Sequence, residues 1–250
     1  MKKFISILLA VVLVIGCVSI FAGCDSKPKN GTLVMGTNAA FAPYEFIDSK
    51  GDFAGIDVDI AKAIAKELDM ELVIKDMEFE SLLLAVQEDT VDIVLAGLTV
   101  DEERKEKVDF TQTYATGKQV IIVKENSAIA SADDLTGKTI GVQSGTTGDM
   151  YCTDDYGQDA VKPYNNGALA IAALMNDQVD CVVIDNEPAK VFVQANEGLK
   201  ILETEYIVED YAAAIAKTNT ELLEKVDAAI TKLKNDGTIA KILAEYIKAE

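Results

Sequence analysis

Hydrophobic residues recur along residues 31–124 with two different periods, and these periods predict strands and helices in turn. Short apolar runs of the kind that form buried strands occur at 32–37, 71–77 and 91–97. Between the first two, an isoleucine or leucine stands at every fourth position from Ile56 to Leu68, which gives a helix one apolar face. Residues 79–88 have a similar helical pattern. Strand, helix, strand, helix and strand in succession predict an α/β unit on a parallel sheet.

The alternation begins again after residue 118, so we predict two α/β lobes. Further strands are expected at 119–124, 138–143, 180–184, 199–202 and 211–217, and further helices at 131–135, from 144–148, 167–175, from 187, 220–234 and 238–248. One lobe is expected to comprise 31–115 plus 212–250 and the other 119–208, with a hinge near 114–119 and 209–213. Each lobe is expected to be a mainly parallel sheet flanked by helices, with the ligand cleft between the lobes.

The start of the chain has the pattern of an export signal. Lys2 and Lys3 precede an apolar stretch that continues to Ala22, and polar residues follow soon after. We therefore predict a signal peptide at 1–23 and an extracytoplasmic location for the folded part. A transmembrane anchor is the alternative.

The end of this apolar stretch resembles the lipobox of bacterial lipoproteins. Residues 21–24 read FAGC, with small residues directly before Cys24, although Phe21 stands where leucine is usual. The resemblance implies that Cys24 is acylated and that residues 24–30 tether the domain to the membrane. Cys17 is a second candidate for lipidation.

Composition excludes several function classes. The formal net charge is −19, and a surface this acidic repels nucleic acid, so we expect no nucleic-acid partner. There is no histidine, which removes the commonest general base and metal ligand, and we expect no catalytic residue, metal or cofactor. The two remaining cysteines, Cys152 and Cys181, are equally compatible with a disulfide and with buried free thiols.

Small and polar side chains gather where the predicted strands end, which is where ligands bind in open α/β sheets. These positions are Asn38, Phe41, Ala96, Gly97, Thr99, Gln143, Thr147 and Asp185. Arg104 follows one turn into a predicted helix and is the only arginine of the chain. A guanidinium grips a carboxylate with two parallel hydrogen bonds, and a carboxylate such as Asp185 suits an ammonium. Together the two residues predict recognition of an amino-acid zwitterion by closure of both lobes.

Several blocks resemble one family in their order along the chain. The chain is similar to the extracytoplasmic solute-binding proteins of polar amino-acid ABC transporters, and the resemblance covers nearly all of 31–248. The matching blocks are 55–60 (GIDVDI), 36–46 (GTNAAFAPYEF), 96–99 (AGLT) with Arg104, 141–146 (GVQSGT) and Asp185. The family implies a two-lobed periplasmic-binding-protein-like fold, and a monomer that delivers a free polar amino acid to the membrane subunits of a permease.

The resemblance also assigns roles to the cleft residues. Arg104, Thr99 and Thr147 would hold the ligand carboxylate. Asp185, together with the carbonyl of Gly97, would hold the α-ammonium.

The remaining cleft residues would surround the side chain of the ligand. Phe41 and Phe79 would stack on it, although each phenylalanine taken alone is as easily explained as ordinary core. Asn38, Gln143 and Ala96 would line the far end.

The identity of the amino acid stays open between two classes. Family members that take cationic amino acids often carry an acid at the position of Asn38, so the amide suggests a neutral polar ligand such as glutamine. Nearby Glu45 keeps arginine or lysine as an alternative. Asp57 and Asp59 are interpreted as residues at a helix start that do not contact ligand.

Two other functions are compatible with the same scaffold. A lyase of the cyclohexadienyl dehydratase type would need a general acid in the cleft, for which Glu45 or Asp185 would have to serve. A sensing domain of a signalling receptor is the second alternative.

Overall fold

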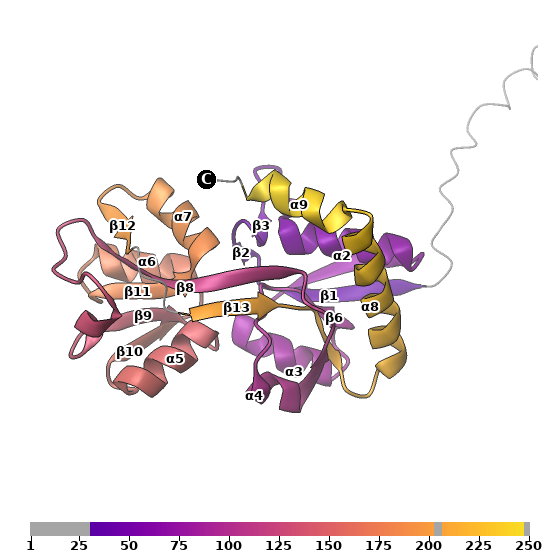
Figure 1. Ribbon diagram of the computed structural model, residues 1–250, viewed down its shortest axis with the longest axis horizontal. Coiled ribbons are helices and arrows are strands. Elements are labelled where there is room, and N and C mark those ends of the chain that lie inside the picture. The colour runs from indigo at the N-terminus through magenta and orange to yellow at the C-terminus, as the bar shows by residue number, and fades with distance from the viewer. Residues whose placement is uncertain (1–30, 203–206, 248–250) are drawn as a thin grey trace, which may run out of the picture.

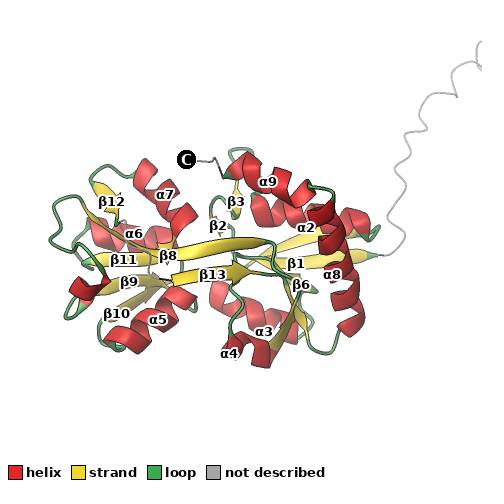
Figure 2. Cartoon of the chain, in the orientation of Figure 1, coloured by secondary structure: helices red, strands yellow, loops and turns green. Residues whose placement is uncertain are grey.

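The computed structural model describes residues 31–202 and 207–247, which fold into two lobes joined by a pair of long strands (Figure 1). Each lobe is a β-sheet with helices packed against it (Figure 2), which confirms the predicted two-lobed α/β fold class. The predicted signal peptide, Cys17, Cys24 and the tether lie outside the described residues. No helix in the described ranges is both long and apolar enough to cross a membrane.

The first lobe contains a five-stranded sheet in the order β5-β1-β6-β14-β7. Its strands are β1 (Thr32–Thr37), β5 (Glu71–Asp76), β6 (Ile93–Val94), β7 (Val108–Phe110) and β14 (Ala214–Ala216). β1 pairs in parallel with β5 and β6, whereas β14 pairs antiparallel with β6 and β7. Because β14 comes from the C-terminal part of the chain, this lobe is assembled from both ends of the described sequence.

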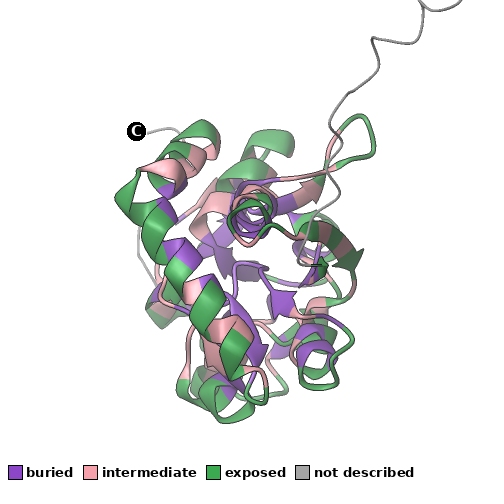
Figure 3. Ribbon diagram, turned by 90° about the vertical axis from the view of Figure 1, so that its right-hand side faces the viewer, coloured by how far each residue is buried: buried purple, intermediate pink, exposed green. Residues whose placement is uncertain are grey.

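Helices flank this sheet on both sides (Figure 1). They are α2 (Ile56–Glu67), the 3₁₀ helix η1 (Phe79–Ser81), α3 (Leu82–Gln87), α4 (Glu102–Lys107), α8 (Thr220–Asn235) and α9 (Thr238–Tyr246). The predicted apolar face of α2 is buried, with Ile56, Ile60 and Ile64 fully inaccessible to solvent. α8 and α9 expose their polar outer faces and bury the opposite faces (Figure 3). A small antiparallel sheet adds β2 (Ala40–Phe41), β3 (Glu45–Ile47) and β4 (Phe53–Ala54).

The second lobe contains a sheet in the order β10-β9-β11-β8-β12, with β13 also paired to β8. The remaining elements of this lobe are η2 (Ala132–Leu135), β9 (Ile140–Gln143), α5 (Thr147–Tyr156), β10 (Val161–Tyr164), α6 (Gly167–Met175), β11 (Cys181–Asp185), α7 (Asn186–Ala195) and β12 (Leu199–Ile201). Cys152 on α5 and Cys181 on β11 are free, fully buried thiols. Burial raises the pKa of the Cys181 thiol to about 12, so it stays protonated and packs as an apolar group.

The two lobes are connected by β8 (Ala115–Lys124) and β13 (Ile207–Tyr211), which lie side by side between them (Figure 1). The two strands are antiparallel, with Ala115 opposite Tyr211 and Gln119 opposite Ile207. The prediction of a single strand at 211–217 was wrong. β13 ends at Tyr211, and a separate strand, β14, begins at Ala214. The chain changes sheets between these two strands.

Other differences from the predicted elements also have physical reasons. The apolar run at 91–97 forms only the two-residue strand β6, because Gly97 adopts a left-handed φ of +54° and turns the chain into the cleft. β7 and β10 were not predicted; β10 contains Pro163 and lies at a sheet edge, where a missing backbone N–H is tolerated. The sheets are more mixed than the mainly parallel ones expected, because β8 and β14 join them antiparallel without a helical crossover.

Gly55 offers a test of the turn that places β3 beside α2. It has a φ of +121°, and a Cβ added there would lie 2.2 Å from the carbonyl oxygen of Tyr44. We expect Gly55→Ala to lower the free energy of unfolding by about 3 kcal/mol or more, measured by chemical denaturation. Gly51→Ala is the matched control, because Gly51 also has a positive φ, +89°, but nothing lies within 4 Å of its added Cβ. An equal effect of both substitutions would contradict the steric argument.

Candidate functional site

A pocket lies between the two lobes. It is lined by Asn38, Phe41, Glu45, Phe79, Ala96, Gly97, Thr99, Arg104, Gln143, Thr146, Thr147 and Asp185. The structure thus brings together all ten residues that the sequence predicted for the cleft. It adds Glu45 and Thr146, which were not among those ten residues.

Arg104 lies at one wall of the pocket and is buried, with only 4% of its surface exposed. It lies on α4, where the side chain of Asp101 caps the helix through the Arg104 backbone N–H at 2.8 Å. The same carboxylate lies 3.1 Å from the guanidinium Nε. Burial lowers the pKa of Arg104, and the adjacent Asp101 opposes this shift, so the guanidinium remains charged.

The outer nitrogens of Arg104 contact both lobes. Nη1 donates to the carbonyl of Thr99 at 2.9 Å, and Nη2 donates to the carbonyl of Gly145 in the second lobe at 3.1 Å. The guanidinium carbon lies 5.6 Å from the centre of the Phe79 ring, within the range of a cation–π contact. Nε is paired with Asp101, and each outer nitrogen uses one of its two N–H groups in these contacts. Each outer nitrogen therefore retains one N–H group that can donate to a carboxylate.

Asp185 supplies the opposite charge from the second lobe. It is the last residue of β11 and is 6% exposed. The hydroxyl of Tyr211 donates to Oδ1, and the amide of Gln119 donates to Oδ2 at 3.0 Å. Burial and the nearby carboxylate of Glu209 raise the pKa of Asp185 to about 7. Tyr211 and Gln119 lie on the two connecting strands, so these strands fix the orientation of this carboxylate.

Gly97 is placed by a buried carboxylate below the pocket. Asp57 Oδ2 accepts the backbone N–H of Gly97 at 2.7 Å and the hydroxyl of Tyr114 at 2.8 Å. Burial raises the pKa of Asp57 to about 7, although both hydrogen bonds act against the shift. Asp57 does lie in the first turn of α2 and outside the pocket lining, as predicted, but its carboxylate also organises the wall. Asp59 instead accepts the hydroxyl of Tyr246 at 2.7 Å.

The polar amides at the far end bridge the two lobes. Gln143 Nε2, at the end of β9, donates to Asn38 Oδ1 at 3.1 Å. Asn38 in turn donates to the carbonyl of Met77 at 2.8 Å, which fixes its oxygen towards Gln143. Thr146 caps α5, and Thr147 is the first residue of that helix, so free backbone N–H groups lie at this side of the pocket.

Glu45 is the pocket residue with the most unusual environment. It has no solvent exposure, and neither carboxylate oxygen has a hydrogen-bond partner among the described residues. Burial raises its pKa well above the usual value, and the charges of Asp57 and Asp185 raise it further. The sequence analysis placed Glu45 near the ligand only as the alternative that favours a cationic amino acid, and did not include it among the ten residues predicted to line the cleft. Its inward orientation follows from the β2–β3 hairpin, in which it pairs with Phe41.

Comparison with known proteins shows the family of this chain. Residues 33–249 match the family described as bacterial extracellular solute-binding proteins, family 3. The arginine-binding extracellular protein ArtP of Bacillus subtilis (strain 168) is 32% identical over 263 residues, covering 100% of both chains.

Two solved structures are also similar. An ancestral arginine-binding protein bound to glutamine has a TM-score of 0.83 at 41% identity, covering 88% of this chain and 99% of that one. The arginine-, lysine-, histidine-binding protein ArtJ from Geobacillus stearothermophilus has a TM-score of 0.83 at 35% identity, covering 88% and 96%. This chain therefore belongs to the family 3 bacterial extracellular solute-binding proteins.

Proposed function

We propose that this protein is an extracytoplasmic receptor that binds arginine or a similar cationic L-amino acid between its lobes and delivers it to an ABC permease. The single observation that carries this specificity is Glu45, a buried carboxylate in the pocket with both oxygens unpartnered. A buried carboxylate without a partner is strongly unfavourable, and a cationic side chain would provide the missing donors.

The rest of the pocket suits the common part of every amino acid. The two remaining N–H groups of Arg104, with Thr99 and Thr147, are suited to the ligand carboxylate. Asp185 and the Gly97 carbonyl are suited to the α-ammonium. These groups come from both lobes, so a bound zwitterion would favour the state in which the lobes are together.

Charge balance favours a cationic ligand over a neutral one. With Glu45 and Asp185 ionised, two negative charges face the single positive charge of Arg104, and the pocket has a net charge of −1. A ligand of net charge +1 neutralises this sum, whereas glutamine requires Glu45 to stay protonated. The names of the relatives, which bind arginine, lysine or histidine, support the same preference. Two observations argue for a neutral polar ligand instead: the side chain of Asn38 is an uncharged amide, and one similar structure is bound to glutamine.

The wider organisation follows from the same proposal. We infer that 31–115 with 212–250 and 119–208 move as two bodies about a hinge near 114–119 and 209–213. We also infer lipid attachment at Cys24, with 24–30 as the tether, and no catalysed reaction. Incubation with prephenate-like acids tests the lyase alternative, because any product formed would contradict a purely binding role.

The ligand preference can be tested by thermal shift against the twenty amino acids. We expect arginine to give the largest shift, because a ligand at a hundred times its Kd adds roughly 2.7 kcal/mol to stability. Glu45→Gln should weaken arginine binding about 100-fold while changing glutamine binding less than tenfold, measured by calorimetry. The matched control is Glu71→Gln at an exposed position, which should change neither. A larger shift with glutamine than with arginine in the unmodified protein would contradict the proposed specificity.

A further inference from the structure

The lobes contact each other outside the ligand pocket, at the edge of the cleft. The hydroxyl of Ser144 donates to Glu80 Oε2 at 2.6 Å, and Asn165 Nδ2 donates to Glu78 Oε1 at 3.3 Å. Glu78 and Glu80 lie at the start of η1 in the first lobe, whereas Ser144 and Asn165 follow strands β9 and β10 of the second. None of these four side chains lines the pocket.

The backbone at Gly145 also lies very close to the first lobe at this edge. A Cβ added to Gly145 would lie 3.0 Å from the Cβ and 3.2 Å from the Cα of Glu80, both closer than ordinary van der Waals contact. The Gly145 carbonyl also accepts the hydrogen bond from Arg104 Nη2. One residue therefore touches Glu80 and the guanidinium of the first lobe at once, and only a residue without a side chain allows this separation.

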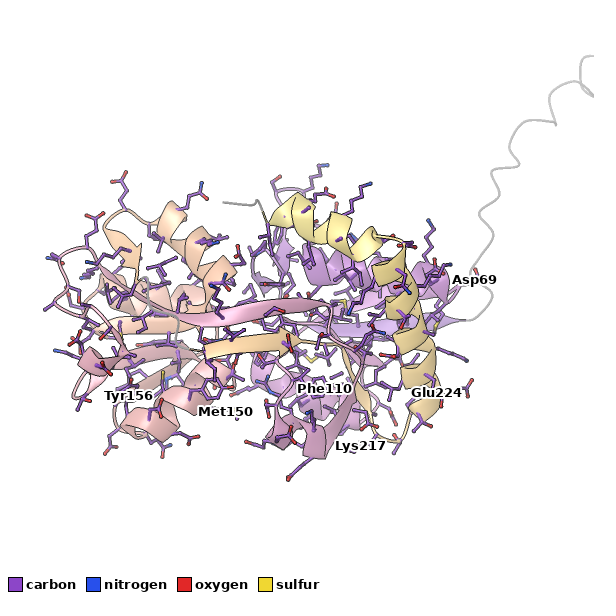
Figure 4. The ribbon with its side chains drawn as sticks, viewed as in Figure 1. Asp69, Phe110, Met150, Tyr156, Lys217 and Glu224 are labelled. Atoms are coloured by element: carbon purple, nitrogen blue, oxygen red, sulfur yellow. The ribbon has the colours of Figure 1, made fainter. Side chains whose placement is uncertain are left out.

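Met150 of α5 continues this contact along the surface. It lies on the side of α5 that faces the first lobe (Figure 4) and shares a surface cavity with Phe79, Leu83 and Gly145. Phe79 and Arg104 line both this cavity and the ligand pocket, so the edge contact and the ligand site share one wall.

We propose that Gly145 and Ser144, with Glu80 opposite them, are affinity-determining residues that act without touching the ligand. This rests on the proposed function, because it assumes that binding brings the lobes together. The Ser144–Glu80 bond and the close packing at Gly145 require the lobes to be together, so they stabilise the closed arrangement that ligand binding favours and not an open one. Any loss of this contact weakens binding although every pocket residue remains in place.

Comparing alanine substitutions at two glycines distinguishes the loss of the contact between the lobes from the effect of backbone strain. Gly145 has a φ of +74°, and Gly137, at the end of η2 in the same lobe, has a φ of +75° with nothing within 4 Å of its added Cβ. Alanine at either position carries the same left-handed penalty in the folded protein, whether the lobes are open or closed. Only Gly145→Ala places a methyl group against Glu80.

The experiment measures binding of L-arginine, with L-glutamine as the second probe, by calorimetry, together with the melting temperature without ligand. We expect Gly145→Ala to weaken binding about tenfold relative to Gly137→Ala, while both lower the ligand-free melting temperature equally. Ser144→Ala and Glu80→Gln should each weaken binding about threefold, and the double variant no more than either one.

The outcomes distinguish this inference from the proposed function. Equal affinities of Gly145→Ala and Gly137→Ala, with the unmodified protein binding normally, would overturn the inference and leave the proposed function intact. Additive effects of Ser144→Ala and Glu80→Gln would likewise show that the two side chains do not act as a pair. Binding of neither probe by the unmodified protein would overturn both proposals.

Discussion

Replacing Arg104 with lysine is expected to weaken amino-acid binding by at least about 100-fold, which corresponds to roughly 2.7 kcal/mol. Lysine keeps the charge but presents one ammonium in place of two parallel N–H groups, so it cannot hold both oxygens of a carboxylate. It also cannot reach Asp101, Thr99 and Gly145 together, as the guanidinium does. Calorimetry with L-arginine and L-glutamine measures the loss.

The melting temperature without ligand decides whether Arg104 is structural instead. Because Arg104 is buried and has three partners, we expect a small decrease, of about 1–2 kcal/mol in unfolding free energy. Lys105→Ala on the exposed face of the same helix is the control and should affect neither quantity. Unfolding of the Arg104→Lys protein, or unchanged affinity, would contradict the role given to this side chain.

Replacing Asp185 with asparagine is expected to weaken amino-acid binding strongly and to change how the affinity depends on pH. Loss of the carboxylate removes the partner of the α-ammonium, so affinity at pH 8 should fall by at least about 100-fold. In the unmodified protein only the ionised form pairs with ammonium, and the pKa of Asp185 is raised to about 7. Affinity should therefore decrease as pH falls from 8 to 5. Asp185→Asn should reduce this dependence, measured by calorimetry in buffers across that range.

The stability of the ligand-free protein should depend on pH in the opposite direction to the affinity. The folded pKa of Asp185 lies above the unfolded value, so its contribution to stability is fully present below about pH 4 and is lost as pH rises to about 7. Asparagine does not ionise, so Asp185→Asn removes the loss of stability that ionisation of Asp185 causes as pH rises. At pH 8 the ligand-free variant should therefore be at least as stable as the unmodified protein. Asp133→Asn, at an exposed position, should leave both profiles unchanged. Identical pH profiles for Asp185→Asn and the unmodified protein would show that other carboxylates, such as Asp57, control them.

The sequence by itself determined the elements whose burial follows a regular period. The stripe from Ile56 to Leu68 specifies one face of α2, and the apolar runs before Gln143 and Asp185 specify β9 and β11. The positions where predicted strands end supplied eight of the ten residues that meet in one pocket, because strands of a parallel pair end at the same edge of a sheet. The other two, Phe79 and Arg104, lie on helices.

Tertiary structure alone decided the features that depend on distant partners. β14 is separate from β13 because the chain changes sheets between them, which no local pattern encodes. β6 is short because Gly97 turns the chain towards the cleft. Glu45 became a pocket residue only when the β2–β3 hairpin turned it inward, and Gly145 became a contact only when the second lobe met Glu80. Periodicity records which face of an element is buried; what that face meets is set by the packing of segments that lie far apart along the chain.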